Sequence, residues 1–477
     1  MEDLLLVILF LFIVLCFSLL GVSHLFAKQE RKNLPSGSMG WPLCGETLAF
    51  LRPHRSNSMG NFIQQHCSRY GKVFKSHLFG SPAIVSCDPA LNLFILQNEE
   101  KLFQANYPKP MVDVLGRLSL LISSGELHKK LRNVVVSFIT ASKSAPLFLL
   151  LVEKMSVSMM DSWKERRKIA FYKEAKKFTL DLMVRNLLSI EPEEPLAFKI
   201  LEDFETYMKG FVSLPIYIPG TAYAKAVKAR ERLSLTVMGI IREREQNISR
   251  DREGDFLDVI MAKQSLSYEE TASVVLDLLL GGYETTAILI ALIVYFLGHA
   301  PKVFERLKEE HQAIRKSKEG GKPLNWEDYQ KMEFTYNVIH EAMRCGNVVK
   351  MVHRKAVKDV IFKDYFIPSG WKVLPIFTAA HLDPTLHENP SEFNPWRWTD
   401  HKEMSRKVMP FGGGLRFCPG AELAKVEISL FLHHLVLNYR WKIKDDDDFP
   451  VAYPYVGFPR GLVLDIEGTE ELVGNKN

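Results

Sequence analysis

Cysteine is scarce in this protein, and its spacing shows no pairing. The six cysteines among 477 residues stand at positions 16, 44, 67, 87, 345 and 418, and no two of them form a CxxC motif. Disulfide-held scaffolds and structural zinc sites both need dense, closely spaced cysteines. The sequence therefore argues against both classes and predicts that most of these cysteines are small, buried, apolar residues.

Dense runs of one charge are also missing. The sequence has 61 Lys and Arg against 56 Asp and Glu, a formal net charge of +5, without a basic block of the kind that binds nucleic acid. We expect no nucleic-acid partner, and the mild positive charge favours an acidic protein partner. Repeats and low-complexity tracts are absent too, and a 47% hydrophobic share with 25% charged residues is that of a globular protein.

One long hydrophobic run is present, near the N-terminus. Residues 4–20 are uncharged and about long enough, with their neighbours, to cross a bilayer. Acidic residues precede the run and basic residues follow it, which disfavours a cleaved signal peptide and places the remaining residues in the cytosol. We expect a single-pass membrane anchor at 1–27, a basic and Pro/Gly-rich hinge at 28–45, and one large domain at 46–477.

Helical periodicity dominates the middle of the sequence, for example over 222–246 and 268–299. Short β-branched stretches at 360–367 and 371–377 are typical of hairpin strands. The sequence therefore predicts a mainly α fold with small β-sheets.

The segment 268–299 is unusually long and apolar for a soluble helix. Asp277, Glu284 and the pair Gly281-Gly282 interrupt it, so the uninterrupted apolar part is too short to span a membrane. We expect a buried central helix.

The most specific motif is FGGGLRFCPG at 411–420, which stands before an apolar helical run. Its glycines allow tight turns and leave backbone amides free to point at a sulfur. Cys418 lies at the entrance of the following helix, where the helix dipole favours a thiolate. An inert cysteine in a phosphate-binding loop is the alternative, but no GK[ST] follows. The motif therefore predicts an anionic sulfur held in a rigid loop.

Phe411, Gly414, Arg416, Cys418 and Gly420 match the fixed positions of the haem-binding loop of the cytochrome P-450 superfamily, which the protein resembles over essentially its whole length. The resemblance implies one large cytochrome P-450-type domain. It also implies a haem (heme b) whose iron takes Cys418 as its axial thiolate ligand.

Two further motifs fit this resemblance. Glu341 and Arg344 look like the ExxR pair of the family, and Arg397 looks like the arginine downstream of it. A Glu and an Arg three residues apart share a helix face, and a second Arg can complete a buried triad. The resemblance implies that the three lock the haem pocket.

Residues 281–286, GGYETT, resemble the oxygen-activation motif of the same superfamily. The small residues, Gly281 first, would open a notch for dioxygen. Thr285 would hydrogen-bond the distal oxygen and Glu284 would relay protons. This acid–alcohol pair implies monooxygenation with O2 as co-substrate. It argues against relatives that rearrange peroxides and against a non-catalytic haem sensor.

Four residues are candidates to bind the haem propionates. Residues 128–132, HKKLR, occupy the place of the family's WxxxR motif, so Arg132 keeps a carboxylate-binding role. His128 replaces the tryptophan and is either a propionate donor or a plain surface histidine. Arg354 and Arg416 are the other candidates.

Electrons have to come from a separate protein, because the sequence has no GxGxxG fingerprint and no flavin-binding stretch. The resemblance implies a membrane-bound NADPH-dependent cytochrome P-450 reductase at the endoplasmic reticulum.

The expected substrate is large and apolar. Segments such as GNVVKMVHRKA and IPSGWKVLP resemble plant steroid hydroxylases of brassinosteroid synthesis, most closely those that hydroxylate C-22 of the sterol side chain. This implies a campesterol-like or cholesterol-like sterol, with a triterpenoid or terpenoid-hormone substrate as the alternative. The apolar segment 211–222 could admit it from the membrane, although a buried loop explains that segment almost as well. The candidate pocket residues are Met111, Val112, Leu115, Gly281, Val348, Val349 and Val456.

Overall fold

The computed structural model of the protein describes Val14 and residues 33–41, 45–246, 254–318, 322–445 and 448–469. The expected membrane anchor and much of the hinge lie outside these residues. The helices are α2 (Thr47–Phe50), α3 (Asn61–Tyr70), α4 (Pro89–Gln97), α5 (Lys109–Leu115), α6 (Gly125–Ser142), α7 (Pro146–Asp161), α8 (Phe171–Leu188), α9 (Pro195–Met208), α10 (Ala222–Gln246), α11 (Phe256–Lys263), α12 (Tyr268–His299), α13 (Pro301–Lys316), α14 (Trp326–Gln330), α15 (Glu333–Gly346), α16 (Phe377–His381), α17 (His401–Lys407) and α18 (Ala421–Asn438), with the 3-10 turns η2 (Pro395–Thr399) and η3 (Gly414–Arg416).

The strands are few and short beside these helices. They are β1 (His54–Arg55), β2 (Val73–Leu78), β3 (Ser81–Ser86), β4 (Phe103–Ala105), β5 (Lys168–Ala170), β6 (Arg354–Ala356), β7 (Val360–Phe362), β8 (Tyr365–Ile367), β9 (Lys372–Pro375), β10 (Tyr439–Ile443), β11 (Val451–Tyr453), β12 (Tyr455–Gly457) and β13 (Val463–Gly468). The prediction of a mainly α fold with small sheets is confirmed.

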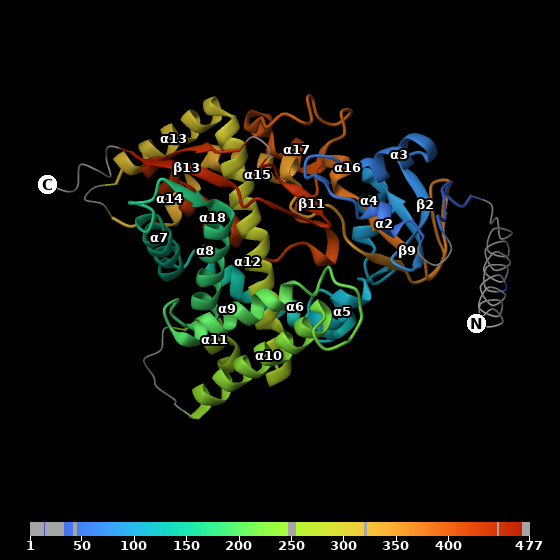
Figure 1. Cartoon of the computed structure of the whole chain (residues 1–477), viewed down its shortest axis with the longest axis horizontal. Helices are drawn as coiled ribbons and strands as arrows, with labels where there is room; N and C mark the ends of the chain where they lie inside the picture. Colours follow the sequence, from blue (N-terminus) through green and yellow to red (C-terminus); the bar gives the residue numbers. More distant parts are fainter. Residues whose placement is uncertain are drawn as a thin grey trace, which may run out of the picture.

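The largest sheet has the strand order β2-β3-β9-β6-β4. Figure 1 shows β2 and β9 with helices α2, α3 and α4 at one end of the molecule, while α7, α8, α13 and α18 gather at the other end. The segment 360–367 forms the expected hairpin of β7 and β8. The hairpin expectation for 371–377 is wrong, because β9 pairs in parallel with β3 and antiparallel with β6, and Phe377 begins α16.

Helix α12 runs through the middle of the molecule between the two ends (Figure 1). It begins after Ser267, whose hydroxyl accepts from the Glu270 amide in a capping box, and this fixes the start that the sequence predicted. In the described part of the protein it is the one unbroken helix long and apolar enough to cross a membrane. The stretch from Thr286 to Val294 is buried throughout, so the prediction of a buried central helix is confirmed.

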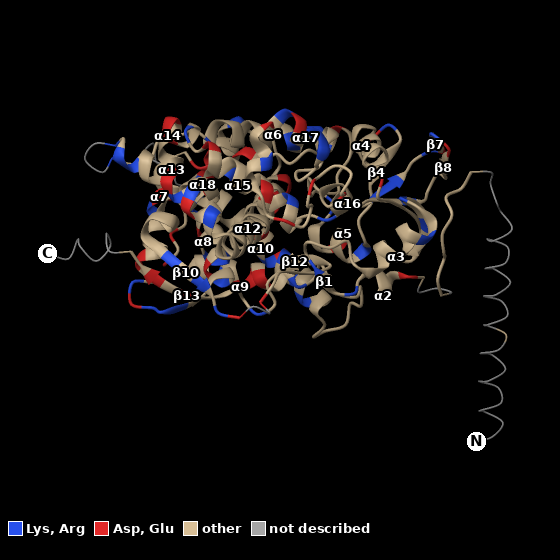
Figure 2. Cartoon of the chain, turned by 90° about the horizontal axis from the view of Figure 1, so that it is seen from above, with Lys and Arg blue, Asp and Glu red and all other residues tan. Residues whose placement is uncertain are grey.

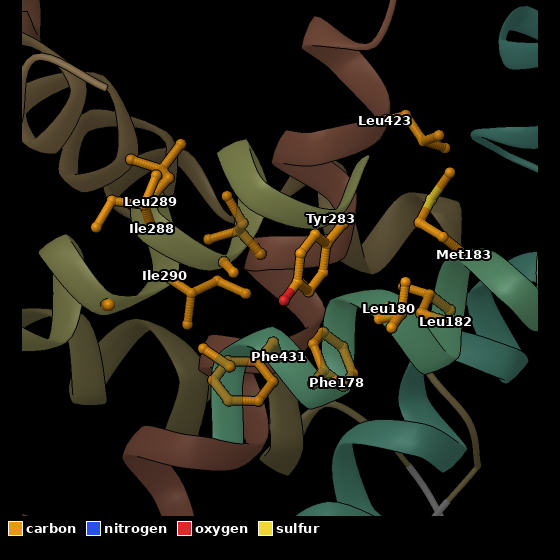
Figure 3. Close-up of a cluster of buried hydrophobic side chains, with 14 of the residues drawn as sticks. Phe178, Leu180, Leu182, Met183, Tyr283, Ile288, Leu289, Ile290, Leu423 and Phe431 are labelled. Atoms are coloured by element: carbon orange, nitrogen blue, oxygen red, sulfur yellow. The ribbon is translucent and has the colours of Figure 1, made fainter. Parts of the chain in front are cut away.

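The core around α12 is completed by α8 and α18. Figure 3 shows Phe178 from α8, Tyr283 from α12 and Phe431 from α18 gathered in one apolar cluster. Phe431 is fully buried, and its ring centroid lies 4.9 Å from that of Phe178. Because α18 follows the Cys418 loop directly, this packing fixes the helix that leads out of that loop.

Replacing Phe431 with Ala should therefore destabilise the protein by about 3–5 kcal/mol, the usual cost of emptying a buried aromatic site. Phe198 is the matched control, because its side chain is 60% exposed and the same substitution there should cost little. Chemical denaturation of both variants beside the unaltered protein measures the difference. Equal midpoints for the two variants would contradict this view of the core.

Candidate functional site

The Cys418 loop is shaped by glycines that the surrounding backbone requires. Gly414 has φ +63°, and a Cβ atom there would lie 1.9 Å from the Leu96 carbonyl oxygen, so a larger residue is excluded. The Cys418 amide donates to the Phe411 carbonyl at 3.0 Å, which closes the loop. Gly420 begins α18 as its N-cap residue, and its amide donates to the Cys418 sulfur.

Opposing effects act on the charge state of Cys418. Burial raises the pKa of the thiol above its usual value, whereas the Gly420 amide and the Arg132 charge act in the opposite direction. A bound metal ion adds a positive charge that favours the thiolate, so the anionic sulfur stays a prediction for the metal-bound protein.

The arginines predicted to bind carboxylates converge on this loop. Arg132 of α6 donates to the Phe417 carbonyl at 2.7 Å. Arg416 donates to the carbonyls of Leu120 at 3.1 Å and Ser123 at 2.5 Å, within the connecting loop 116–124 between α5 and α6. Two segments far apart in the sequence, 116–132 and 411–418, thus meet at the Cys418 loop.

Arg354 and Arg416 also share a partner that the sequence did not single out. The Glu99 carboxylate is 1% exposed, and its two oxygens accept from Nε of Arg354 at 2.5 Å and Nε of Arg416 at 2.6 Å. A lone Glu after a helix has no local signal for this role, because its partners stand 255 and 317 positions away.

His128 is not the surface histidine that was one of its two interpretations, because it is only 3% exposed. Burial, followed by the charge of Arg416, lowers the pKa of its imidazole to about 4. The ring is therefore neutral at pH 7 and has one N–H to donate. Its Nδ1 lies 3.9 Å from the Glu100 carboxylate.

An accessible strip interrupts the buried surface of α12. Gly281 and Thr285 are exposed, whereas Tyr283 and Thr286 beside them are buried. A Cβ atom at Gly281 would meet nothing within 4 Å, but one at Gly282 would lie 2.4 Å from the Met183 sulfur of α8. Open space therefore lies beside Gly281, whereas Gly282 allows two helices to pack closely, and the notch for dioxygen stays a prediction.

Glu284 and Thr285 face different neighbours, because adjacent helical residues point about 100° apart. The Glu284 carboxylate accepts from the Tyr172 hydroxyl at 2.8 Å and pairs with Lys176 Nζ at 2.9 Å, both from α8. The Thr285 hydroxyl donates to the Gly281 carbonyl at 2.5 Å. The sequence missed Tyr172 and Lys176, although their spacing of four residues places them on one helix face.

Asp277 lies one turn before Gly281 and holds the connecting loop. Its carboxylate accepts from the Ser119 hydroxyl at 2.7 Å and from the Leu120 amide at 2.6 Å. Burial raises the pKa of this carboxyl to about 7 despite these two donors and the Arg230 charge. The sequence noted Asp277 only as an interruption of the apolar run.

Glu341, Arg344 and Arg397 come together as a buried charged cluster. Arg344 donates to both carboxylate oxygens of Glu341 at 2.8 and 2.9 Å, and Arg397 Nε donates to one of them at 2.8 Å. Trp398 adds an indole N–H at 2.9 Å. Their role in shaping the pocket stays a prediction.

The candidate pocket residues fall into two groups. Met111, Val112 and Val348 are partly buried and Val349 is 38% exposed, whereas Leu115 and Val456 are buried within the main core. Met111 accepts a hydrogen bond at its sulfur from Tyr455, a neighbour of Val456 that is 49% exposed. Tyr455 is thus a further candidate.

The residues around Cys418 provide few metal ligands, so they suit a cofactor in which most ligands of the metal belong to the cofactor itself. Within the described residues no group of three or more His, Cys, Asp or Glu could hold a metal ion. Cys418 provides one sulfur ligand. The guanidinium groups of Arg132, Arg354 and Arg416 and the neutral imidazole of His128 are N–H donors that can bind carboxylates. These residues fit a haem with a single thiolate ligand and two propionates.

Comparisons with known proteins agree with this site. The family model "Cytochrome P-450" matches residues 35–464. The protein is 55% identical to cytochrome P-450 724B1 of Oryza sativa subsp. japonica, over 94% of this sequence and 95% of the relative. It is 42% identical to the cholesterol 22-monohydroxylase CYP90B51 of Trigonella foenum-graecum, over 95% of this sequence and 96% of the relative. The solved structure of retinoic-acid-bound cyanobacterial CYP120A1 matches with a TM-score of 0.82 at 26% identity, over 92% of this sequence and 100% of that one.

The two adjacent glycines of α12 should respond differently to Ala. Gly281→Ala has open space and should stabilise the protein by about 0.5–1 kcal/mol, the usual helix gain. Gly282→Ala forces Met183 to move and should lose that gain or destabilise by about 1–3 kcal/mol. Denaturation midpoints of the two variants test this, and equal midpoints would contradict the packing described here.

Asp277 should make stability depend on pH. Its pKa in the folded protein is about 7 against an ordinary value of 3.8, so between these values the folded protein binds more protons than the unfolded protein. The stability from the protonated carboxyl is fully present below pH 3.8 and is lost as the pH rises through about 7. The unfolding free energy should therefore fall relative to that of Asp277→Asn over this range. A difference independent of pH would refute the prediction.

Proposed function

The chain belongs to the cytochrome P-450 family, and from this premise we propose that this monooxygenase hydroxylates the side chain of a plant sterol at C-22. The reaction would serve the synthesis of brassinosteroids or related steroids. The observation that carries the substrate class is the full-length similarity to a relative that is named a cholesterol 22-monohydroxylase.

The cofactor is proposed to be haem b with Cys418 as its axial ligand. When bound, haem b supplies the iron that activates O2 and allows one oxygen atom to enter a C–H bond. Phe411, Gly414 and Gly420 shape the loop around the sulfur. Arg132, Arg354, Arg416 and His128 would hold the propionates.

Protons would reach the site through Glu284 and Thr285. Glu284 Oε1 is occupied by Tyr172 and Lys176, so the other carboxylate oxygen is the one that exchanges a proton with water. Lys176 is partly exposed and keeps this carboxylate near solvent. Thr285 Oγ1 then delivers the proton on the accessible strip, after its hydroxyl turns from the Gly281 carbonyl.

Electrons would come from NADPH through a separate cytochrome P-450 reductase. Arg132 connects α6 to the Cys418 loop, and the same helix has the exposed Lys129 and Lys130, which pair with Glu126 and Glu270. Figure 2 shows basic segments beside the labels α6 and α17, with acidic segments among them. An acidic protein surface would be attracted to this side of the molecule.

We place the protein at the endoplasmic reticulum membrane, anchored by residues 1–27, with its catalytic domain in the cytosol. An exposed apolar segment between α9 and α10 supports a second membrane contact. Leu214, Tyr217 and Ile218 in it are 74%, 57% and 58% exposed. This exposure favours membrane access over a buried loop for 211–222, and a sterol dissolved in the bilayer could enter there.

Product analysis tests the substrate. Microsomes with this protein, a reductase and NADPH should convert campesterol or cholesterol into a product heavier by one oxygen, with the hydroxyl on the side chain, as mass spectrometry would show. Cys418→Ala is the negative control and should give neither this product nor the red-shifted carbonyl band of a thiolate-ligated haem. A triterpenoid is incubated in parallel. Protein with an intact carbonyl band that oxidises only the triterpenoid would overturn the sterol assignment.

A further inference from the structure

Glu99 stands at the junction of the segments that surround the Cys418 loop. It follows α4 directly, and besides the two arginines its carboxylate accepts from the Ala105 amide at 3.1 Å. Donors from three segments therefore saturate one buried carboxylate. Holding two guanidinium groups so rigidly limits the directions in which their remaining N–H groups can point.

The three arginines differ in how many of their N–H groups are already hydrogen-bonded within the protein. Arg416 directs Nη1 at the Leu120 and Leu121 carbonyls and one N–H of Nη2 at the Ser123 carbonyl, so the second N–H of Nη2 has no acceptor among the described residues. Nη1 of Arg354 donates to the His353 carbonyl at 3.0 Å, whereas its Nη2 has no acceptor among the described residues. Arg132 pairs with the Phe417 carbonyl but with no carboxylate among the described residues.

The charges of this cluster do not cancel within the protein. Three guanidinium groups, of Arg132, Arg354 and Arg416, face one buried carboxylate, that of Glu99. Glu100 contacts none of the three arginines, because its carboxylate accepts from the Gly125 amide at 2.7 Å and lies 3.9 Å from His128, so its charge is not counted with theirs. Two positive charges remain, and a haem has two propionates. The charges of the three guanidinium groups, the Glu99 carboxylate and the two propionates therefore add up to zero.

We propose that Glu99 is a positioning residue for the cofactor. It fixes Arg354 and Arg416 so that they can receive the propionates, and it neutralises the one positive charge that the propionates leave uncompensated. This inference rests on the proposed haem site. It adds a residue that acts through the arginines and touches neither haem nor substrate.

If Glu99 acted only through packing and hydrogen bonds, removing its charge would have a different effect from the one that the proposal expects. Glu99→Gln keeps the size of the side chain and its amide oxygen but removes the negative charge. An uncompensated cation near the iron stabilises the reduced state, because reduction adds an electron. The reduction potential must then shift to more positive values, which loss of packing alone does not require.

The experiment uses full-length holoprotein and three variants. Glu99→Gln should keep the thiolate carbonyl band, lose haem to apomyoglobin about 10- to 100-fold faster, and show a positive shift of the reduction potential in spectroelectrochemistry. Glu126→Gln removes the same charge from an 89% exposed side chain in the first turn of α6 and should match the unaltered protein in both measurements. Glu99→Asp keeps the charge but shortens the side chain, so it should lose haem faster at an unchanged potential.

The outcomes separate the two hypotheses. A potential in Glu99→Gln equal to that of Glu126→Gln would overturn the role of Glu99 while the haem site stands. If Glu99→Gln does not fold, Glu99→Asp decides, because a normal rate of haem loss there would overturn the proposal. Unaltered protein without the carbonyl band would overturn the haem site, and the role of Glu99 with it.

Discussion

Ion pairs and hydrogen bonds to the buried Glu341 carboxylate join the segments that precede the Cys418 loop. Arg397 and Trp398 of the 3-10 turn η2 donate to this carboxylate, and Arg344, from the same helix α15 as Glu341, also binds the carbonyls of His381 and Pro390. A buried ion pair is costly to form and more costly to break, so these partners are held in one arrangement. The backbone that leads from η2 into the Cys418 loop starts from this fixed point.

The polar residues of helix α12 lie on different faces of the helix. The face toward α8 has Glu284 with its Tyr172 and Lys176 partners, while the accessible strip has Gly281 and Thr285. In the proposed mechanism, Glu284 on the first face takes up the proton and Thr285 on the second delivers it. One glycine allows close packing of α8 and its neighbour leaves open space, so each face keeps its own function.

Local signals explain what the sequence could predict. The bounds of α10 and α12, the glycine-rich Cys418 loop and the Glu341–Arg344 pair are all encoded within a few neighbouring residues. Glu99, Asp277 and the contrast between Gly281 and Gly282 depend on partners far along the sequence or on another helix. The pKa of the Cys418 thiol also depends on its burial, a property of the folded protein that the neighbouring residues do not encode.

The connecting loop 116–124 is held by two other parts of the protein, Asp277 of α12 and Arg416 of the Cys418 loop. A ligand cannot push it aside without breaking hydrogen bonds to both. In the proposed monooxygenase, changes of substrate specificity would therefore be easier in the neighbouring parts, α5 and the exposed segment 211–222. Evolution or a protein engineer could alter these parts while α12 and the Cys418 loop keep their relative positions.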